Sequence, residues 1–359
     1  MEKRVKIKLT LEDGTEFFGE SFGSQVAKAG EVVFNTAMTG YPESLTDPSY
    51  RGQILCLTYP LVGNCGAPSK HEENEIFKFY GSSSIHIAGL IVSDYSFEYS
   101  HWNAGESLDS WLKRNNVPGV FGIDTRALTK IIREKGSMLG KLEPEGETVE
   151  FYDPNKVNLV AEVSTSEKKI YGKGKFKILL IDCGVKFSVI RELLKRDTTI
   201  IRVPWDYDFS KEDYDGLFIS NGPGDPKMCG ITIENIRKAF ESDKPIFGIC
   251  LGNQLMGLAS GADTYKLKYG HRSHNQPVIL AGTNKAYITS QNHGFTVDNK
   301  TLKTDWEPFF VNINDNTNEG MRHKTKPFFS TQFHPGASGG PTDTDYLFDQ
   351  FIDNIIARG

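Results

Sequence analysis

The sequence predicts an α/β protein of two domains: an N-terminal α+β domain and a C-terminal domain whose mostly parallel sheet is flanked by helices. With 359 residues, the chain is longer than one typical domain. It begins with an antiparallel strand pattern, and after about residue 175 short apolar segments alternate with helical ones. We therefore predict an N-terminal domain at 1–140, a connecting segment at 141–174 and a C-terminal domain at 175–359.

The N-terminal elements begin with a hairpin. Residues 5–11 and 15–22 alternate in polarity like strands, and Glu12-Asp13-Gly14 between them is a turn signal. Residues 87–92 are apolar throughout, which is typical of a buried strand. Together these patterns predict a small sheet that begins antiparallel.

A helix and a linker complete this half of the chain. Asp124 is placed to cap the start of a helix that ends before Gly136. Residues 141–174 are rich in Gly, Pro, Glu and Lys, which favours a connection over a core.

The C-terminal half alternates strands and helices. The expected strands lie at 177–182, 199–204, 215–220 and 245–249, and the expected helices at 185–196 and around 230–242. This alternation predicts parallel strands with helices on the faces of the sheet. In such sheets the active site lies at the carboxyl ends of the strands.

Composition excludes several classes of protein. Acidic residues outnumber basic ones 46 to 41, and the basic residues are scattered, so we expect no nucleic-acid partner. No segment is long and apolar enough for a membrane span, so we expect no membrane partner. The five cysteines are irregularly spaced, which indicates a reducing compartment. The expected location is the cytoplasm, or the mitochondrion if the chain is an excised domain.

Cys250 is the strongest candidate for a catalytic residue. It lies in an apolar strand, a Gly-x-Cys-x-Gly turn and a helix, the pattern of a nucleophile elbow. Gly248 and Gly252 allow the strand and the helix to approach closely around the turn. The helix N-terminus then favours the thiolate. A buried structural cysteine is the alternative.

A thiol nucleophile needs a base, and histidine is the natural choice near neutral pH. His334 follows the strand pattern of residues 327–333 and precedes Pro335, which places it at the same end of the sheet as Cys250. His293, in the run Ser-Gln-Asn-His-Gly-Phe, is the rival candidate.

A third loop follows the strand at 215–220. Its sequence, Ser220 to Pro226, contains two glycines within three residues. Such a loop can turn backbone amides toward an oxyanion, although a plain turn has the same composition.

The motifs SNGPGDP, GICLGNQ, SQNHGF and QFHP, in that order, resemble the class I glutamine amidotransferases. The N-terminal run FNTAMTGYPESLTDPSYRGQILCLTYPLVGN resembles the small-subunit domain of carbamoyl-phosphate synthetases. The resemblance extends from about residue 5 to 356. The N-terminal part argues against an amidotransferase that serves another product, such as anthranilate or GMP.

The resemblance implies a role for each matching residue. Cys250 would be the attacking thiolate, and His334 its general base and acid. The residues expected to hold L-glutamine are Ser49, Gly222, Gly224, Leu251, Gln254, Asn292, Gly294 and Phe295. Backbone amides near Gly222 and Leu251 would serve the oxyanion, and a γ-glutamyl thioester would form and be hydrolysed.

The resemblance also implies a partner. Ammonia would pass to a synthetase large subunit or fused synthetase domain, which consumes bicarbonate and two ATP. The chain has no Gly-x-x-x-x-Gly-Lys-[Ser/Thr] loop and no evident carboxylate cluster for magnesium. We therefore expect ATP and Mg²⁺ on the partner, and neither a cofactor nor a metal in this chain.

Two positions depart from the family pattern. The third triad residue is a glutamate in the family, whereas this chain has Gly336, and Asn253 replaces a common histidine. An active glutaminase with an incomplete triad is one hypothesis, and a catalytically impaired docking module of an ammonia-fed synthetase is the other. On the first, restoring the carboxylate with Gly336→Glu is expected to raise turnover or leave it unchanged.

Overall fold

The computed structural model describes residues 4–73 and 76–358. The chain divides into two compact units between Val157 and Asn158, a point inside the predicted connecting segment. Within the described residues, no helix combines the length and apolar character that a membrane crossing requires.

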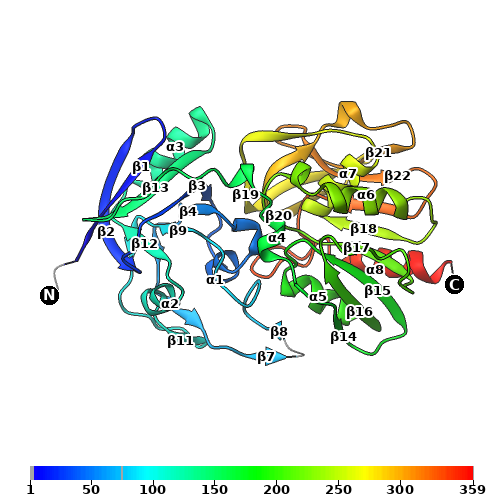
Figure 1. Ribbon diagram of the computed structural model, residues 1–359, viewed down its shortest axis with the longest axis horizontal. Helices are drawn as coiled ribbons and strands as arrows, with labels where there is room; N and C mark the ends of the chain where they lie inside the picture. The colour runs from blue at the N-terminus through cyan, green and yellow to red at the C-terminus, as the bar shows by residue number, and fades with distance from the viewer. Residues whose placement is uncertain (1–3, 74–75, 359) are drawn as a thin grey trace. The chain divides into compact units, whose positions relative to one another are not determined.

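The first unit is built around a closed barrel (Figure 1), in the strand order β1-β13-β3-β4-β9-β12-β2. The predicted hairpin is confirmed, since β1 and β2 pair antiparallel with Leu9 opposite Phe17. The pairs β3–β4, β4–β9 and β9–β12 are parallel. The barrel strands are β1 Lys6–Leu11, β2 Glu16–Gly23, β3 Lys28–Asn35, β4 Gln53–Leu57, β9 Gly89–Ile91, β12 Pro118–Phe121 and β13 Met138–Pro144.

Helices and short strands cover this barrel. In α3, Asp124 caps the first turn as predicted, because its Oδ1 accepts a hydrogen bond of 2.9 Å from the N–H of Ala127. Gly136 follows the last helical residue. The helices are α1 Tyr41–Leu45, α2 Leu108–Arg114, α3 Thr125–Lys135 and the 3₁₀ turn η1 Pro48–Tyr50, and the short strands are β5 Leu61–Val62, β6 Ala67–Pro68, β7 Glu72–Glu73, β8 Ile76–Phe77, β10 Asp94–Tyr95 and β11 Ala104–Glu106.

The second unit contains a ten-stranded sheet in the order β14-β16-β15-β17-β18-β23-β22-β21-β19-β20. The five strands from β16 to β23 pair in parallel, which confirms the predicted α/β class. The strands are β14 Lys169–Tyr171, β15 Phe176–Asp182, β16 Thr198–Pro204, β17 Gly216–Ile219, β18 Ile246–Ile249, β19 Thr264–Leu280, β20 Ala286–Val297, β21 Trp306–Asn312, β22 Asn318–His323 and β23 Phe328–Thr331.

Helices accompany the parallel part of the sheet (Figure 1). They are α4 Val160–Val163, α5 Phe187–Leu194, α6 Gly230–Ala239, α7 Leu251–Ala259 and α8 Tyr346–Ile356, with the 3₁₀ turns η2 Pro154–Lys156 in the first unit and η3 Pro226–Met228 and η4 Asn299–Thr301 in the second. On one face, the rings of Phe218 and Phe247 meet Phe348 of α8. Burial of these aromatic rings fixes the central strands β17 and β18, whose carboxyl ends carry the candidate site.

The sequence did not predict the antiparallel half of this sheet. The strands β19 and β20 form a long hairpin whose register shifts twice, between Lys266 and His271 and between Ser273 and Gln276. The irregular pairing interrupts the period of two on which strand prediction depends. This hairpin carries Asn292 and its neighbours.

Candidate active site

Cys250 is held in a strained backbone conformation between β18 and α7. Its φ is 55° and its ψ is −104°, a combination that non-glycine residues seldom adopt. Such a conformation costs about 1–3 kcal/mol and persists only where the surroundings impose it. Here the N–H of Cys250 donates a hydrogen bond of 2.7 Å to the carbonyl of Thr331 at the end of β23.

Two glycines allow this sharp turn. A Cβ at Gly248 would lie 2.6 Å from Sδ of Met256 and 2.8 Å from the backbone of Gly252. A Cβ at Gly252 would lie 2.3 Å from the carbonyl oxygen of Ile219 on β17. The strand and the helix approach one another as closely as the elbow pattern predicts.

The Cys250 thiol is surrounded by segments that the sequence singled out. Its Sγ lies 3.7 Å from the carbonyl oxygen of Asn292 and donates to it. Leu251 packs near the SNGPG loop, because a Cβ at Gly222 would lie 2.8 Å from Cδ2 of Leu251. Gln254 donates a hydrogen bond of 2.8 Å to the carbonyl of Phe295. The cysteine turn, the SNGPG loop and β20 are therefore neighbours.

His334 lies at the same end of the sheet. Strands β18 and β23 are parallel neighbours, with Ile249 opposite Thr331, so Cys250 and His334 both follow the carboxyl ends of adjacent strands. The N–H of His334 donates 2.9 Å to the carbonyl of Ser290 on β20. His334 remains the predicted base on this placement.

His293, the rival base, has each ring nitrogen close to an oxygen atom of β20. Its Nδ1 lies 2.8 Å from the carbonyl of Phe295, and its Nε2 lies 3.1 Å from Oε1 of Gln291. Burial, followed by the charge of His271, holds the pKa of His293 well below its usual value. These contacts give His293 a structural place in β20.

Three other predicted glutamine contacts lie in different surroundings. Gly224 has a positive φ and lies near Leu159, and Gly294 lies beside the guanidinium of Arg272. Ser49 lies in η1 of the first unit, where its N–H donates 2.9 Å to Oδ1 of Asp47. The role of all three in binding glutamine stays a prediction.

Sequence reasoning missed a buried amide network beside Cys250. Oε1 of Gln332 accepts from Nε2 of Gln254 at 3.1 Å and from Nδ2 of Asn253 at 3.2 Å. Asn253 also accepts 2.7 Å from the hydroxyl of Ser330. At the position where the family resemblance led us to expect histidine, Asn253 therefore has its polar side-chain atoms paired. The only indication of this network in the sequence was the position of Gln332, two residues before His334.

Gly336 lies in a tight polar pocket. Its φ is +67°, and its N–H donates 2.8 Å to Oδ1 of Asp345. A Cβ at this position would lie 2.7 Å from Cγ of Glu192. The carboxylate of Glu192 is itself paired with Lys195 and Arg196.

This environment narrows the sequence-based expectation for Gly336→Glu, because a gain in turnover is no longer expected. A glutamate would have to keep the left-handed backbone conformation of this position, which costs roughly 1–2 kcal/mol for a residue with a Cβ. It would also introduce a second carboxylate beside Glu192. We expect a lower free energy of unfolding and no gain in glutamine turnover. Urea denaturation and a glutamate-release assay measure the two effects.

Gly146→Glu is a matched control for that variant. Gly146 also has a positive φ, of +90°, but a Cβ there would meet nothing within 4 Å. The difference between the variants then isolates the crowding at Glu192 from the backbone strain. Equal stability of Gly336→Glu and the parent would contradict the prediction.

The geometry defines a class of protein. A parallel α/β sheet carries a cysteine in a strained elbow, a histidine at the end of the adjacent strand and a Gly-Pro-Gly loop beside the following helix. These features define the class of α/β proteins with a nucleophile-elbow turn.

Comparison with known families agrees with this class. The family described as "Glutamine amidotransferase class-I" matches residues 179–354, and "Carbamoyl-phosphate synthase small chain, CPSase domain" matches residues 9–142. The arginine-specific carbamoyl phosphate synthase small chain of Saccharomyces cerevisiae is 49% identical over 98% of this chain and 89% of its own length. The chain belongs to the carbamoyl-phosphate synthase small-chain family, whose second domain is a class I glutamine amidotransferase.

Longer relatives share the same region. The mitochondrial carbamoyl-phosphate synthase [ammonia] of Homo sapiens is 52% identical over 98% of this chain, and the multifunctional protein CAD of Squalus acanthias is 52% identical over 96%. The chain spans 24% of the human protein and 16% of the shark protein. Family members thus occur both as separate small chains and as parts of larger synthetases.

Proposed function

We propose that this chain hydrolyses L-glutamine through Cys250 and delivers the ammonia to a carbamoyl-phosphate synthetase large subunit or fused synthetase domain. The observation that carries the proposal is the strained backbone of Cys250, with φ 55° and ψ −104°. Strain of this kind is retained at nucleophile elbows, where it positions the reacting atom beside a helix N-terminus.

The proposed reaction has two halves. His334 accepts the proton of the Cys250 thiol, Sγ attacks the carboxamide carbon of glutamine, the C–N bond breaks, and His334 passes that proton to the leaving ammonia. Water then attacks the γ-glutamyl thioester and His334 accepts its proton, which releases glutamate and restores the thiol. In each half, the oxyanion would face backbone N–H groups.

Leu251 and the Gly222 loop are the proposed source of those N–H groups. Leu251 is the first residue of α7, and the first N–H groups of a helix have no acceptor within it. Donors fixed in this way commonly contribute about 10²–10³-fold to acyl transfer. The helix N-terminus also favours the Cys250 thiolate.

Ammonia is the product that links this chain to its proposed partner. We propose that ATP, Mg²⁺ and bicarbonate bind to the synthetase and that this chain supplies only nitrogen. Isolated activity is then expected to be weak and to rise on binding the synthetase, since unproductive hydrolysis would waste glutamine.

The test compares two nitrogen sources. The chain is combined with a synthetase partner, and carbamoyl phosphate formation is measured with glutamine and with ammonium as the donor, beside glutamate release by the chain alone. We expect synthesis from glutamine and a partner-dependent rise in glutamate release. Synthesis from ammonium alone, with no glutamate released, would contradict the proposal.

That contrary result would identify the second candidate function, a catalytically impaired docking module of an ammonia-fed synthetase. The observation that favours this candidate is Gly336 in place of the family's triad glutamate. Two other carboxylates contact this position: Oδ1 of Asp345 accepts 2.8 Å from the N–H of Gly336, and a Cβ at residue 336 would lie 2.7 Å from Cγ of Glu192. Glutamate release in the assay would show that His334 can act without the triad glutamate.

A further inference from the structure

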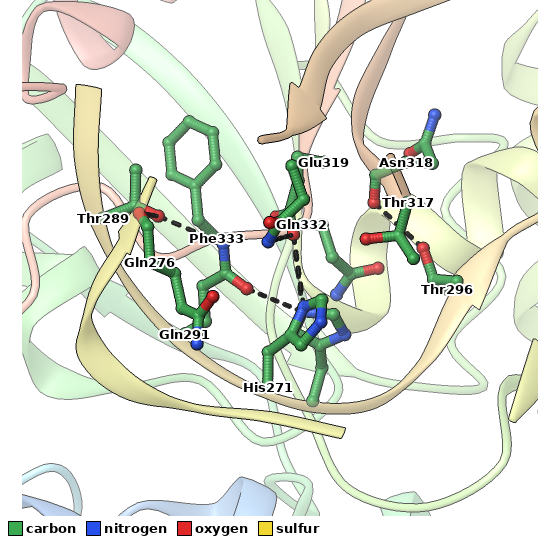
Figure 2. A network of polar contacts seen from close by, with 12 residues as sticks. His271, Gln276, Thr289, Gln291, Thr296, Thr317, Asn318, Glu319, Gln332 and Phe333 are labelled. Carbon is green, nitrogen blue, oxygen red and sulfur yellow. Dashed lines mark hydrogen bonds and ion pairs between the residues drawn. The ribbon is translucent and has the colours of Figure 1, made fainter. Parts of the chain in front are cut away.

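Three buried side chains of metal-ligand type converge in the antiparallel half of the second unit. His271 lies on β19, His293 on the paired position of β20, and Glu319 on β22. One ligand atom from each lies within 4.8 Å of the other two. Figure 2 shows Glu319 pointing toward the imidazole of His271. The candidate functional site described above does not use this cluster.

His271 is oriented like a metal ligand with an outer carboxylate. Its Nε2 hydrogen-bonds to Oδ2 of Asp315 at 2.8 Å, which directs Nδ1 toward Glu319. Nδ1 lies 3.4 Å from Oε1 of Glu319, an ion-pair contact that lacks the geometry of a well-formed hydrogen bond. Metal-binding imidazoles commonly donate their outer nitrogen to a carboxylate in this way.

His293 presents a lone pair to the same point. Its Nδ1 faces the carbonyl of Phe295, which can only accept, so the single proton of the neutral ring lies there and Nε2 is an acceptor. The atom facing Nε2 is Oε1 of Gln291, 3.1 Å away. Two acceptors therefore face one another.

The amide of Gln291 does not resolve this conflict by turning over. Its Nε2 donates 3.1 Å to the hydroxyl of Thr289, and that hydroxyl donates its only proton to the carbonyl of Gln276 at 2.9 Å (Figure 2). The hydroxyl must therefore receive a donor from Gln291, which keeps Oε1 toward His293.

Glu319 completes the set. It is fully buried, and its Oε2 has no hydrogen-bond partner among the described residues. Oε1 accepts 2.9 Å from Nδ2 of Asn312, which orients the carboxylate. A buried, partly unpaired carboxylate is costly unless a positive charge lies beside it, either on protonated His271 or on a bound cation.

We propose that His271 Nδ1, His293 Nε2 and a carboxylate oxygen of Glu319 bind one first-row divalent cation, with Zn²⁺ as the best match. The separations from Glu319 Oε1, 3.4 Å to His271 and 4.0 Å to His293, are close to the roughly 3.3 Å between ligand atoms of a tetrahedral site with bonds of about 2.0 Å. Oε1 of Gln291 faces the same position. Two imidazoles and a carboxylate suit such cations, unlike Mg²⁺ or Ca²⁺.

A proton on His271 is the competing occupant. Burial lowers the pKa of His271, but hydrogen bonds and charges from Asp315 and Glu319 outweigh it and raise that pKa to about 9. A protonated His271 satisfies Glu319 but leaves His293 facing Gln291. A cation satisfies all three ligands at once.

The cation would hold three strands together next to the candidate active site. His293 lies between Asn292, whose carbonyl faces Cys250, and Gly294. Cation binding at His293 would therefore fix the backbone that adjoins the nucleophile.

The test uses the full chain, stripped with a chelator and dialysed, with Co²⁺ as a spectroscopic probe. We expect visible d–d absorption that saturates at about one Co²⁺ per chain and is displaced by Zn²⁺. We also expect Zn²⁺ to raise the thermal midpoint in a concentration-dependent manner. His271→Gln and Glu319→Gln are expected to weaken Co²⁺ binding at least about 10-fold.

Two controls separate this site from other ligands. His323→Gln alters a histidine on β22 that is not part of the cluster, and Cys250→Ser removes the active-site thiol. Both are expected to bind Co²⁺ like the parent. Equal binding by the parent and by both cluster variants, or loss of binding in Cys250→Ser, would overturn the proposal. Circular dichroism identifies a variant that fails to fold, and the other cluster variant then decides.

Discussion

Cys250→Ser is expected to reduce glutamate release from glutamine by at least about 10³-fold while leaving the fold intact. A hydroxyl replaces the thiol at nearly the same volume, so the packing around this 2% exposed residue is retained. The hydroxyl is a far weaker nucleophile here, because its pKa is much higher than that of a thiol and it stays protonated where a thiol ionises. The measurement is steady-state glutamate production by the chain bound to a synthetase.

Cys229→Ser is the matched control for that variant. Cys229 is also fully buried in the second unit, and burial raises the pKa of its thiol to about 12, which makes it inert. We expect Cys229→Ser to retain parental turnover per folded molecule. Equal turnover by the parent and Cys250→Ser would refute the nucleophile assignment and favour the docking-module function.

Gly252→Ala is expected to destabilise the second unit by about 1–3 kcal/mol and to reduce turnover about 10²-fold. Its Cβ would lie 2.3 Å from the carbonyl oxygen of Ile219, a backbone atom of the central strand β17 that cannot move aside cheaply. Relief requires α7 to move away from the sheet, and α7 carries the N–H groups proposed for the oxyanion. Thermal unfolding and turnover are measured on the same sample.

Gly230→Ala provides the comparison. Both glycines lie in the first turn of a helix, Gly230 in α6 and Gly252 in α7. A Cβ at Gly230, however, would meet nothing within 4 Å. Alanine favours a helix over glycine by up to about 1 kcal/mol, so this variant is expected to be as stable as the parent or more so. If both variants lost stability equally, close packing at Gly252 would not be the cause.

Local signals made much of the fold predictable from the sequence. The turn at Asp13-Gly14, the Asp124 cap and the apolar strand before Cys250 each depend on residues close together in the chain. The closure of the N-terminal barrel and the β19–β20 hairpin depend on contacts between distant segments and on irregular register. The hydrophobic period and the composition of a segment indicate neither the closure of the barrel nor the register of the hairpin.

The candidate site divides in the same way. The motifs that contain Cys250, Gln254 and the SNGPG loop are each continuous in sequence and could be recognised there. In the structure, the loops and helix that carry them are in contact, as expected for adjacent parallel strands. Gln332 makes its hydrogen bonds to residues distant in the chain, so the sequence could not indicate the amide network. His271 and Glu319 lie on separate strands, and their spacing is not that of a recognisable metal-binding motif. The crowding at Gly336 could not be predicted either, because it arises from Glu192 on α5, more than 140 residues away in the chain.

The backbone bond from Cys250 to Thr331 has a consequence for how the site fluctuates. It continues the ladder between β18 and β23 up to the nucleophile itself, while His334 is bonded to Ser290 on β20. The amide proton of Cys250 should therefore exchange with solvent only when two central strands separate, an event close to global unfolding. Main-chain bonds thus hold the cysteine and histidine segments in place, so loss of one orienting side chain can slow the chemistry without loosening the frame.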